Sequence, residues 1–300
     1  MRLLVFALLF LAGCTDSQTA QEGSSIIEFA GRLQYKPLDE ASGLAWSGQA
    51  DDLLWAVNDG GAAVVYGIGA DGSKRGKVGI HKAGHRDWED MEAFTLGGKS
   101  YLLIADIGDN DAERKDVSLY IVEEPHPGEK EVDIGWRIDF SYPDGPRDAE
   151  AIAVDADNEL IYVLSKRDIP AHLYSLPLRP GTNDTITAQY VGLFNSLPQP
   201  TRADVNAAPL TNDRHWQPTG MAIAPDGKAA LVLTYGAIYY YARAPGETWT
   251  DALGHPPLRL VLRRLPGAES ITFSSSGMQA WVTTEGRQAP LLRVDLEGVR

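Results

Sequence analysis

Short apolar runs alternate with polar turns along most of the chain, and one order of runs recurs five times. Each recurrence opens with a small or acidic residue at the start of an apolar run, continues with a more apolar run that ends in polar residues, and finishes with a third run. The opening runs are residues 41–45, 88–91, 149–153, 218–222 and 268–272. The second runs are residues 53–58, 101–106, 160–165, 230–234 and 280–284. The third runs are residues 64–68, 118–122, 172–176, 237–241 and 291–294. β-Branched and aromatic residues dominate these runs, and no long apolar pattern of helical period follows residue 14, so the runs are predicted to be strands.

A strand triplet that recurs in this way is typical of a β-propeller, in which small sheets surround a central channel. Fourth, outer strands are predicted at residues 77–80, 132–142, 185–194 and 258–265. The last recurrence has no fourth strand, and residues 26–38 are expected to supply it and to close the ring, which removes exposed sheet edges. The pattern predicts one all-β domain over residues 26–300, a β-propeller of five blades. A six-bladed ring with a degenerate blade within residues 179–216 is the alternative.

The first residues have the order of a bacterial export signal: Arg2, then a short apolar stretch, then Leu11-Ala12-Gly13-Cys14. The stretch is too short to span a membrane as a helix. Its end resembles the lipobox of bacterial lipoproteins, which implies a signal peptide over residues 1–13 and a lipid on Cys14. Residues 14–25 would then be the lipidated cysteine and a flexible tether, and Thr15 favours the outer membrane of a bacterial cell envelope. An ordinary secretory signal is the alternative. Because Cys14 is the only cysteine, no internal disulfide is expected.

The formal net charge of the chain is −14 at pH 7. Phosphate backbones are bound by clustered cations, so this charge argues against nucleic acid as a partner. It also argues against adhesion to an anionic membrane surface by anything other than the lipid.

In a propeller the innermost strand of each blade starts at one mouth of the channel, and the second strand returns to the same mouth. The aligned opening positions are Ser42, Glu89, Glu150, Thr219 and Glu269. Neighbouring openings and strand exits add further carboxylates: Asp59, Asp90, Asp106, Asp109 and Glu285. The basic residues expected nearby are Lys166, Arg147 and Arg86. The sequence therefore predicts an acidic mouth.

Carboxylates in a confined site repel one another unless a cation lies among them. Oxygen-rich ligation without cysteine suits Ca²⁺ better than Zn²⁺ or copper. The candidate metal ligands are Glu89, Glu150, Glu269, Asp106 and Asp90. Two alternatives remain open, namely salt bridges to the nearby basic residues and a solvated acidic rim. Residues 109–113 begin like a calcium-binding loop, but Arg114 stands where that loop needs glycine, so a charged surface loop is expected there.

Several motifs carry a resemblance to known propellers. Asp87-Trp88-Glu89-Asp90, the segment 105–110 (Ala-Asp-Ile-Gly-Asp-Asn) and the segments 142–151 and 218–223 resemble a group of uncharacterised bacterial secreted propellers. The opening at residues 40–45 also resembles phytase-like and "esterase-like activity of phytase" propellers. The resemblance covers most of residues 39–296 and implies a propeller fold with Ca²⁺ on the axis. It does not imply a reaction, because one fold carries many functions.

Two classes of function fit the sequence, and a third is a variant of the second. The first is a ligand- or partner-binding module, in which the acidic face contacts a small molecule or a protein. The second is a metal-dependent hydrolase of phosphoesters, with Lys166 and Arg147 as candidate catalytic residues that neutralise developing charge. A lactone hydrolase would need a similar metal site and fewer cations. No nucleophile-elbow, zinc-protease or phosphate-loop motif is present. The positions of Lys166 and Arg147 relative to the mouth distinguish these possibilities.

Overall fold

The computed structural model describes residues 21–22, 27–182, 184–199, 202, 214–262, 265 and 267–299. The predicted signal peptide, Cys14, most of the tether and, within the interval 179–216, residues 183, 200–201 and 203–213 lie outside these residues. The described part is all-β apart from the helix α2 (Trp249–Ala252). None of its helices has the length and apolar character needed to cross a membrane.

The strands of the described residues form four hydrogen-bonded sheets. The largest has the order β3-β4-β5-β6-β10-β9-β8-β7, with β14 beside β10. Its strands are β3 (Ala41–Trp46), β4 (Leu54–Asn58), β5 (Val64–Ile68), β6 (Lys74–His81), β7 (Trp88–Leu96), β8 (Lys99–Asp106), β9 (Val117–Glu123), β10 (Glu131–Ser141) and β14 (Ile186–Thr187). The second sheet, in spatial order, is β11 (Ala149–Asp155), β12 (Leu160–Ser165), β13 (His172–Pro177) and β15 (Gln189–Leu193).

The other two sheets contain the N-terminal strands as well as the C-terminal ones. In spatial order the third is β1 (Gln21–Glu22), β19 (Leu258–Val261), β18 (Ala237–Ala242), β17 (Ala229–Thr234) and β16 (Pro218–Ile223). The fourth is β2 (Ile27–Arg32), β22 (Pro290–Asp295), β21 (Gln279–Thr284) and β20 (Ala268–Phe273). The N-terminal strand β2 thus lies on the outer edge of the last sheet, antiparallel to β22.

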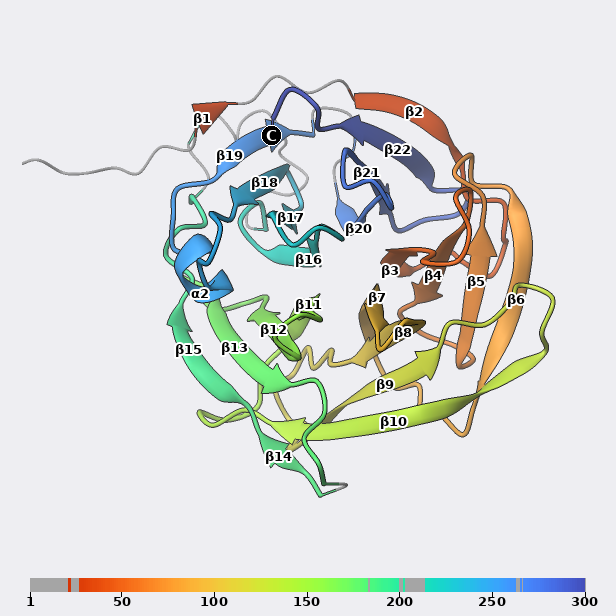
Figure 1. The fold of residues 1–300 in the computed structure, drawn as a ribbon, viewed down its shortest axis with the longest axis horizontal. Coiled ribbons are helices and arrows are strands. Elements are labelled where there is room, and N and C mark those ends of the chain that lie inside the picture. Colours follow the sequence, from red (N-terminus) through yellow and green to blue (C-terminus); the bar gives the residue numbers. More distant parts are fainter. Residues whose placement is uncertain are drawn as a thin grey trace, which may run out of the picture.

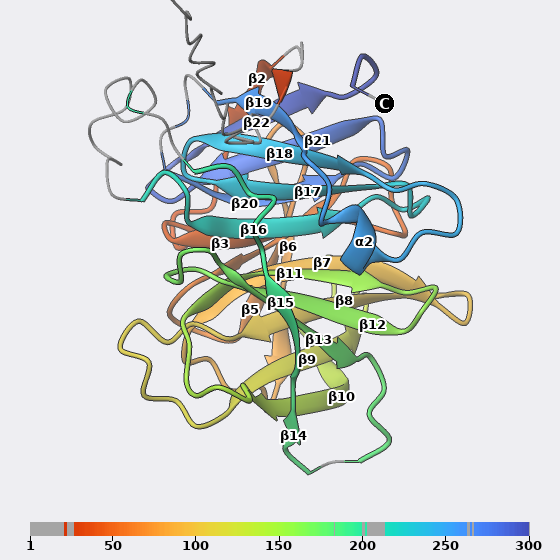
Figure 2. The same ribbon diagram turned by 90° about the vertical axis from the view of Figure 1, so that its left-hand side faces the viewer.

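The sheets are arranged around a common axis, as in a propeller (Figure 1). The strands nearest the axis are β3, β7, β11, β16 and β20. Each contacts the next around the axis, and β20 contacts β3, so the inner strands close a ring. The strands run between the two faces of this ring (Figure 2).

Two details differ from the sequence-based expectation. The strands β6 and β10 pair in parallel through residues 131–133, which joins two groups of four strands into one sheet. This pairing is possible because β10 has eleven residues and extends past the start of its pairing with β9. The two residues of β1 lie within the predicted tether, yet they pair with β19.

The hydrophobic core is divided among the gaps between neighbouring groups of strands around the axis, including the gap between β3–β6 and β7–β10 of the largest sheet. Trp55 and Trp88 are fully buried in one gap, and Trp249 and Tyr241 are buried in another. Near the axis the strands approach closely, and a Cβ on Gly43 would lie 2.7 Å from the backbone nitrogen of Met91. The small residues of the opening runs therefore allow the inner strands to pack around the axis.

Candidate functional site

Each inner strand is irregular at its start, where its register with the second strand shifts by one residue. The shifts fall between residues 41 and 43, 88 and 90, 149 and 151, 218 and 220, and 268 and 270. The residues left without a paired partner are Ser42, Glu89, Glu150, Thr219 and Glu269. A β-bulge redirects the side chain of its extra residue. These are the same positions that the sequence pattern aligns at the channel mouth.

The hydroxyl and carboxyl side chains at these positions are used differently. The Ser42 hydroxyl donates to the carbonyl of Trp88 on the neighbouring inner strand, at 2.6 Å. The Thr219 hydroxyl donates to the carbonyl of Ala268 in the same way, at 2.8 Å. The three glutamates of the set instead line the open space at the end of the channel.

That space is a cavity of about 380 Å³ at the mouth. It is lined by Ser42, Asp59, Glu89, Asn110, Glu150, Lys166, Arg167, Arg214, Gln217, Tyr235, Gly267, Glu269 and Glu285. The structure thus brings three of the predicted metal ligands and one of the two candidate catalytic residues to one cavity.

Two groups of three carboxylates within the described residues have the spacing of a metal site. One consists of Asp59, Asp87 and Glu89, and the other of Glu89, Asp148 and Glu150. In each group the ligand oxygens lie within 4.8 Å of one another. Glu89 belongs to both groups and is therefore the centre of the arrangement.

Burial and mutual repulsion perturb these carboxyls. Burial, with the charges of Glu150 and Asp87, holds the pKa of Glu89 well above its ordinary value. Burial and a hydrogen bond with Asp59 raise the pKa of Asp87 to about 7. Burial also raises the pKa of Glu150 to about 7, although the Lys166 ammonium opposes the shift. The cavity therefore holds more carboxyls than it can keep ionised without an added cation.

Glu89 differs sharply from another buried glutamate, Glu124. Glu124 accepts hydrogen bonds from Ser47, Gly48, Trp55 and Ser100, so its charge is fully compensated. Glu89 is only 7% exposed, and within the described residues it has neither a hydrogen-bond donor nor an ion-pair partner. Burying an ionised carboxylate without compensation is strongly unfavourable.

Two further observations concern the space around Glu89. A Cβ on Gly108 would lie 2.4 Å from carboxyl atoms of both Asp87 and Glu89, so a glycine is needed where the chain passes these groups. The Gln217 side-chain oxygen is buried and lacks a hydrogen-bond partner within the described part of the chain. Gln217 is thus a second residue at the cavity whose acceptor oxygen has no hydrogen-bond donor among the described residues.

The two candidate catalytic residues have different surroundings. Lys166 lies in the cavity, forms an ion pair with Glu150, and has its ammonium 5.5 Å from the centre of the Tyr235 ring. Burial alone would lower the pKa of Lys166, but Glu150 and other negative groups outweigh it and raise that pKa. Arg147 pairs with Asp144 at 2.6 Å and with Asp168 at 2.7 Å, and it does not line the cavity. The expectation that both cations face the mouth therefore holds only for Lys166.

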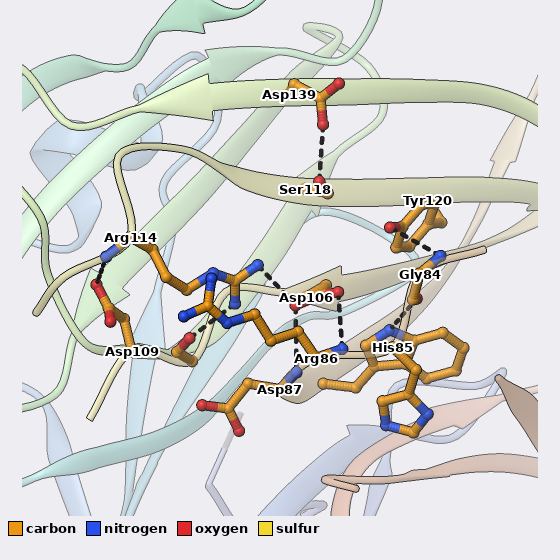
Figure 3. A network of polar contacts seen from close by, with 12 residues as sticks. Gly84, His85, Arg86, Asp87, Asp106, Asp109, Arg114, Ser118, Tyr120 and Asp139 are labelled. Carbon is orange, nitrogen blue, oxygen red and sulfur yellow. Dashed lines mark hydrogen bonds and ion pairs between the residues drawn. The ribbon is translucent and has the colours of Figure 1, made fainter. Parts of the chain in front are cut away.

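Asp106 does not join the carboxylate groups around Glu89. Its carboxylate forms an ion pair with the buried Arg114 at 2.8 Å and accepts hydrogen bonds from the backbone of Arg86 and Asp87 (Figure 3). Arg114 also donates to the carbonyl of Gly108, and Asp109 accepts from the backbone of residues 113 and 114. Asp106 therefore has a structural role, since its hydrogen bonds hold the segment that carries Asp87.

Asp90 also lies apart from the cluster, inside the channel. Its carboxylate accepts from the backbone of Ile152 at 2.9 Å and of Met221 at 3.4 Å, and burial raises its pKa well above the ordinary value. Glu92, two residues on, bonds in the same way to residues 154 and 223. These side chains connect β7 to β11 and β16 across the channel. They stand between the mouth and a second cavity of about 470 Å³ at the opposite ends of the inner strands.

Sequence reasoning missed Asp87 and Asp148 as members of the carboxylate groups. The same signal was present for both, because Asp87 and Asp148 each stand two residues before an opening glutamate, and side chains two residues apart in extended chain share a face. What the sequence does not reveal is how Asp148 is held. It bonds to the backbone of Asp109 and pairs with Arg167, contacts that join segments distant in sequence.

No protein-family model matches the chain, and no curated protein matches its sequence. Among solved structures, it is similar to a crystal structure of a nidogen/laminin complex, with 13% identity over 84% of this chain and 74% of that chain and a TM-score of 0.46. It is also similar to the PQQ-bound aldose sugar dehydrogenase of Streptomyces coelicolor, with 11% identity over 92% and 99% of the two chains and a TM-score of 0.44.

Proposed function

We propose that this chain is a lipid-anchored β-propeller of the bacterial cell envelope that binds Ca²⁺ at its acidic mouth and serves as a ligand- or partner-binding module. Five blades are proposed because five inner strands follow one another around the axis and the N-terminal strand β2 completes the last sheet. The lipid on Cys14 and the outer-membrane location rest on the sequence of residues 11–15.

One observation carries the cation proposal: Glu89 is buried, faces other carboxylates, and among the described residues has no hydrogen-bond donor or ion-pair partner, while the charge of Lys166 offsets its own only in part. A bound divalent cation would compensate Glu89 and its neighbours together. Calcium is favoured because the available donors are carboxylate and amide oxygens, which suit a hard cation of high coordination number. The neighbourhood of Glu89 has no cysteine, and the motif of residues 105–110 supplies the glycine that makes room for the carboxyls.

The test is calorimetric titration of calcium chloride into the full chain after treatment with a chelator. Binding at one site is expected, with Glu89→Gln weakening it by at least about 100-fold because a central ligand is lost. Glu131→Gln, an exposed glutamate on β10, is the matched control and should bind as the parent does. If the parent chain shows no calcium binding, the cation proposal is wrong.

A metal-dependent hydrolase is the second candidate, and Lys166 is the observation that favours it. Its ammonium lies in the same cavity as the carboxylates, where a positive group could neutralise charge developing on a substrate. Arg147 does not contribute, since it is paired outside the cavity. Calcium-dependent turnover of a generic phosphoester or lactone, abolished by Lys166→Met, would support this function. If the same assay shows no turnover, the binding module remains the proposed function.

A further inference from the structure

The two carboxylate groups that share Glu89 are not equivalent. In the group on the β11 side, Glu150 is paired with Lys166, and Asp148 is paired with Arg167 at 2.5 Å. In the other group, neither Asp59 nor Asp87 has an ion-pair partner among the described residues, and they share a hydrogen bond with each other. One group is thus already neutralised by the protein and the other is not.

Lys166 is held beside two of the carboxylates at the mouth, Glu150 and Glu269. Its side chain is buried, it contacts Glu150, and its ammonium faces the Tyr235 ring. The Tyr235 hydroxyl in turn bonds to Glu269 and to Lys166. A tethered ammonium therefore occupies the space between Glu150 and Glu269, the two carboxylates that the sequence placed on the axis together with Glu89.

We propose that Lys166 is a built-in counter-ion that excludes the divalent cation from the Glu150–Glu269 side and confines it to Asp59, Asp87 and Glu89. The inference rests on the proposed calcium binding and deepens it by naming the ligands and the residue that limits affinity. An observation outside the carboxylates points the same way: Gln217 is more than nine-tenths buried, lines the cavity, and has a side-chain oxygen without a hydrogen-bond partner in the described structure.

Two pairs of variants test this assignment on the full chain, with calcium alone as the probe in calorimetry. Asp87→Asn is expected to weaken binding by about 100-fold, since it removes a ligand charge, and Glu269→Gln by less than about fivefold. Lys166→Met is expected to strengthen binding by about tenfold, because it removes a positive charge from the cavity and releases Glu150. Lys166→Arg keeps the charge and should not show this gain.

The outcomes separate the inference from the proposed function. Failure of the parent chain to bind calcium refutes the cation proposal itself. Binding that Glu269→Gln abolishes and Asp87→Asn spares places the cation on the axis and overturns the inference alone. Unchanged or weaker binding in Lys166→Met also overturns it, provided that thermal unfolding shows that variant to be folded. A second calcium per chain in Lys166→Met supports it, because the freed group at Glu150 would then be filled.

Discussion

Replacing Glu89 with glutamine tests whether this side chain is there to bind a cation or to hold the fold together. In the cation-free protein the carboxyl of Glu89 faces Asp87 and Glu150 without a donor of its own. Glutamine has nearly the same shape, carries no charge, and can donate its amide protons to those carboxylates. We expect Glu89→Gln to raise the stability of the cation-free chain and to remove the stabilisation by calcium.

The size of the gain follows from the geometry. Two ionised carboxylates at 4.8 Å, the outer limit of the oxygen spacing in each group, repel by about 3.5 kcal/mol at an effective dielectric constant of about 20. The alternative, keeping an ordinary carboxyl protonated at pH 7, costs about 3 to 4 kcal/mol. Since the carboxyl can always take up a proton instead, the cost of protonation sets an upper bound of about 3 to 4 kcal/mol for the penalty that glutamine relieves. A gain of about 1 to 3 kcal/mol corresponds to a rise in Tm of about 2 to 6 °C for a domain of this size.

The assay is thermal unfolding of the full chain at pH 7.5, in chelator and in calcium at about 100 times the Kd. The parent chain should gain about 2.7 kcal/mol from calcium at that concentration. Glu89→Gln should begin from a higher Tm and gain nothing, whereas Glu131→Gln should behave as the parent. The reasoning fails if Glu89→Gln lowers the Tm in chelator and calcium still raises it, because Glu89 would then be a structural side chain.

Three further predictions concern the supports of the site and the channel. Gly108→Ala should weaken calcium binding by about tenfold or more, since a Cβ would collide with the carboxyls of the site; Gly128→Ala, at an open surface position, should change nothing in the same calorimetric titration. Glu124→Gln should lower the free energy of unfolding, measured in denaturant, by about 2 to 3 kcal/mol, because the amide nitrogen of glutamine would face hydrogen-bond donors that now bond to a carboxylate. Burial raises the pKa of Glu92 from an ordinary value of 4.5 to about 8, so the stability from its bound proton is complete below about pH 4.5 and is lost as the pH rises through 8. The Tm of the parent chain should therefore fall more steeply between pH 5 and pH 8.5 than that of Glu92→Gln, and parallel profiles would contradict this.

The strand pattern could be predicted because each blade encodes its own strands. Apolar runs with turns between them depend on local sequence, and the predicted runs coincide with strands of the structure within one or two residues at most positions. The parallel pairing of β6 with β10 could not be predicted, since it joins segments about fifty residues apart and follows from the length of β10. An alternation of apolar and polar residues with a period of two does not specify which strand the outer strand of a sheet will pair with.

The same limit explains which parts of the site were found. The opening positions Glu89, Glu150 and Glu269 recur at one place in the repeat, so their convergence follows from the repeat itself. Asp90 was grouped with Glu89 although adjacent residues on a strand point to opposite faces, and the structure places it inside the channel. The partner of Asp106 is Arg114, which lies across an irregular loop whose path no periodicity specifies.

The choice between a hydroxyl and a carboxyl at the bulge of each inner strand decides what that strand contributes to the mouth. Ser42 and Thr219 donate to a carbonyl of the next inner strand and so tie the ring together. The glutamates at the equivalent positions have no such bond available and leave their charge in the cavity. One of them, Glu150, is compensated by Lys166, so the charge that remains is concentrated at Glu89 beside Asp59 and Asp87. The off-axis cation site proposed above would thus follow from which inner strands carry a carboxyl and which neighbouring strand carries a lysine, within a frame of strands that repeats around the axis.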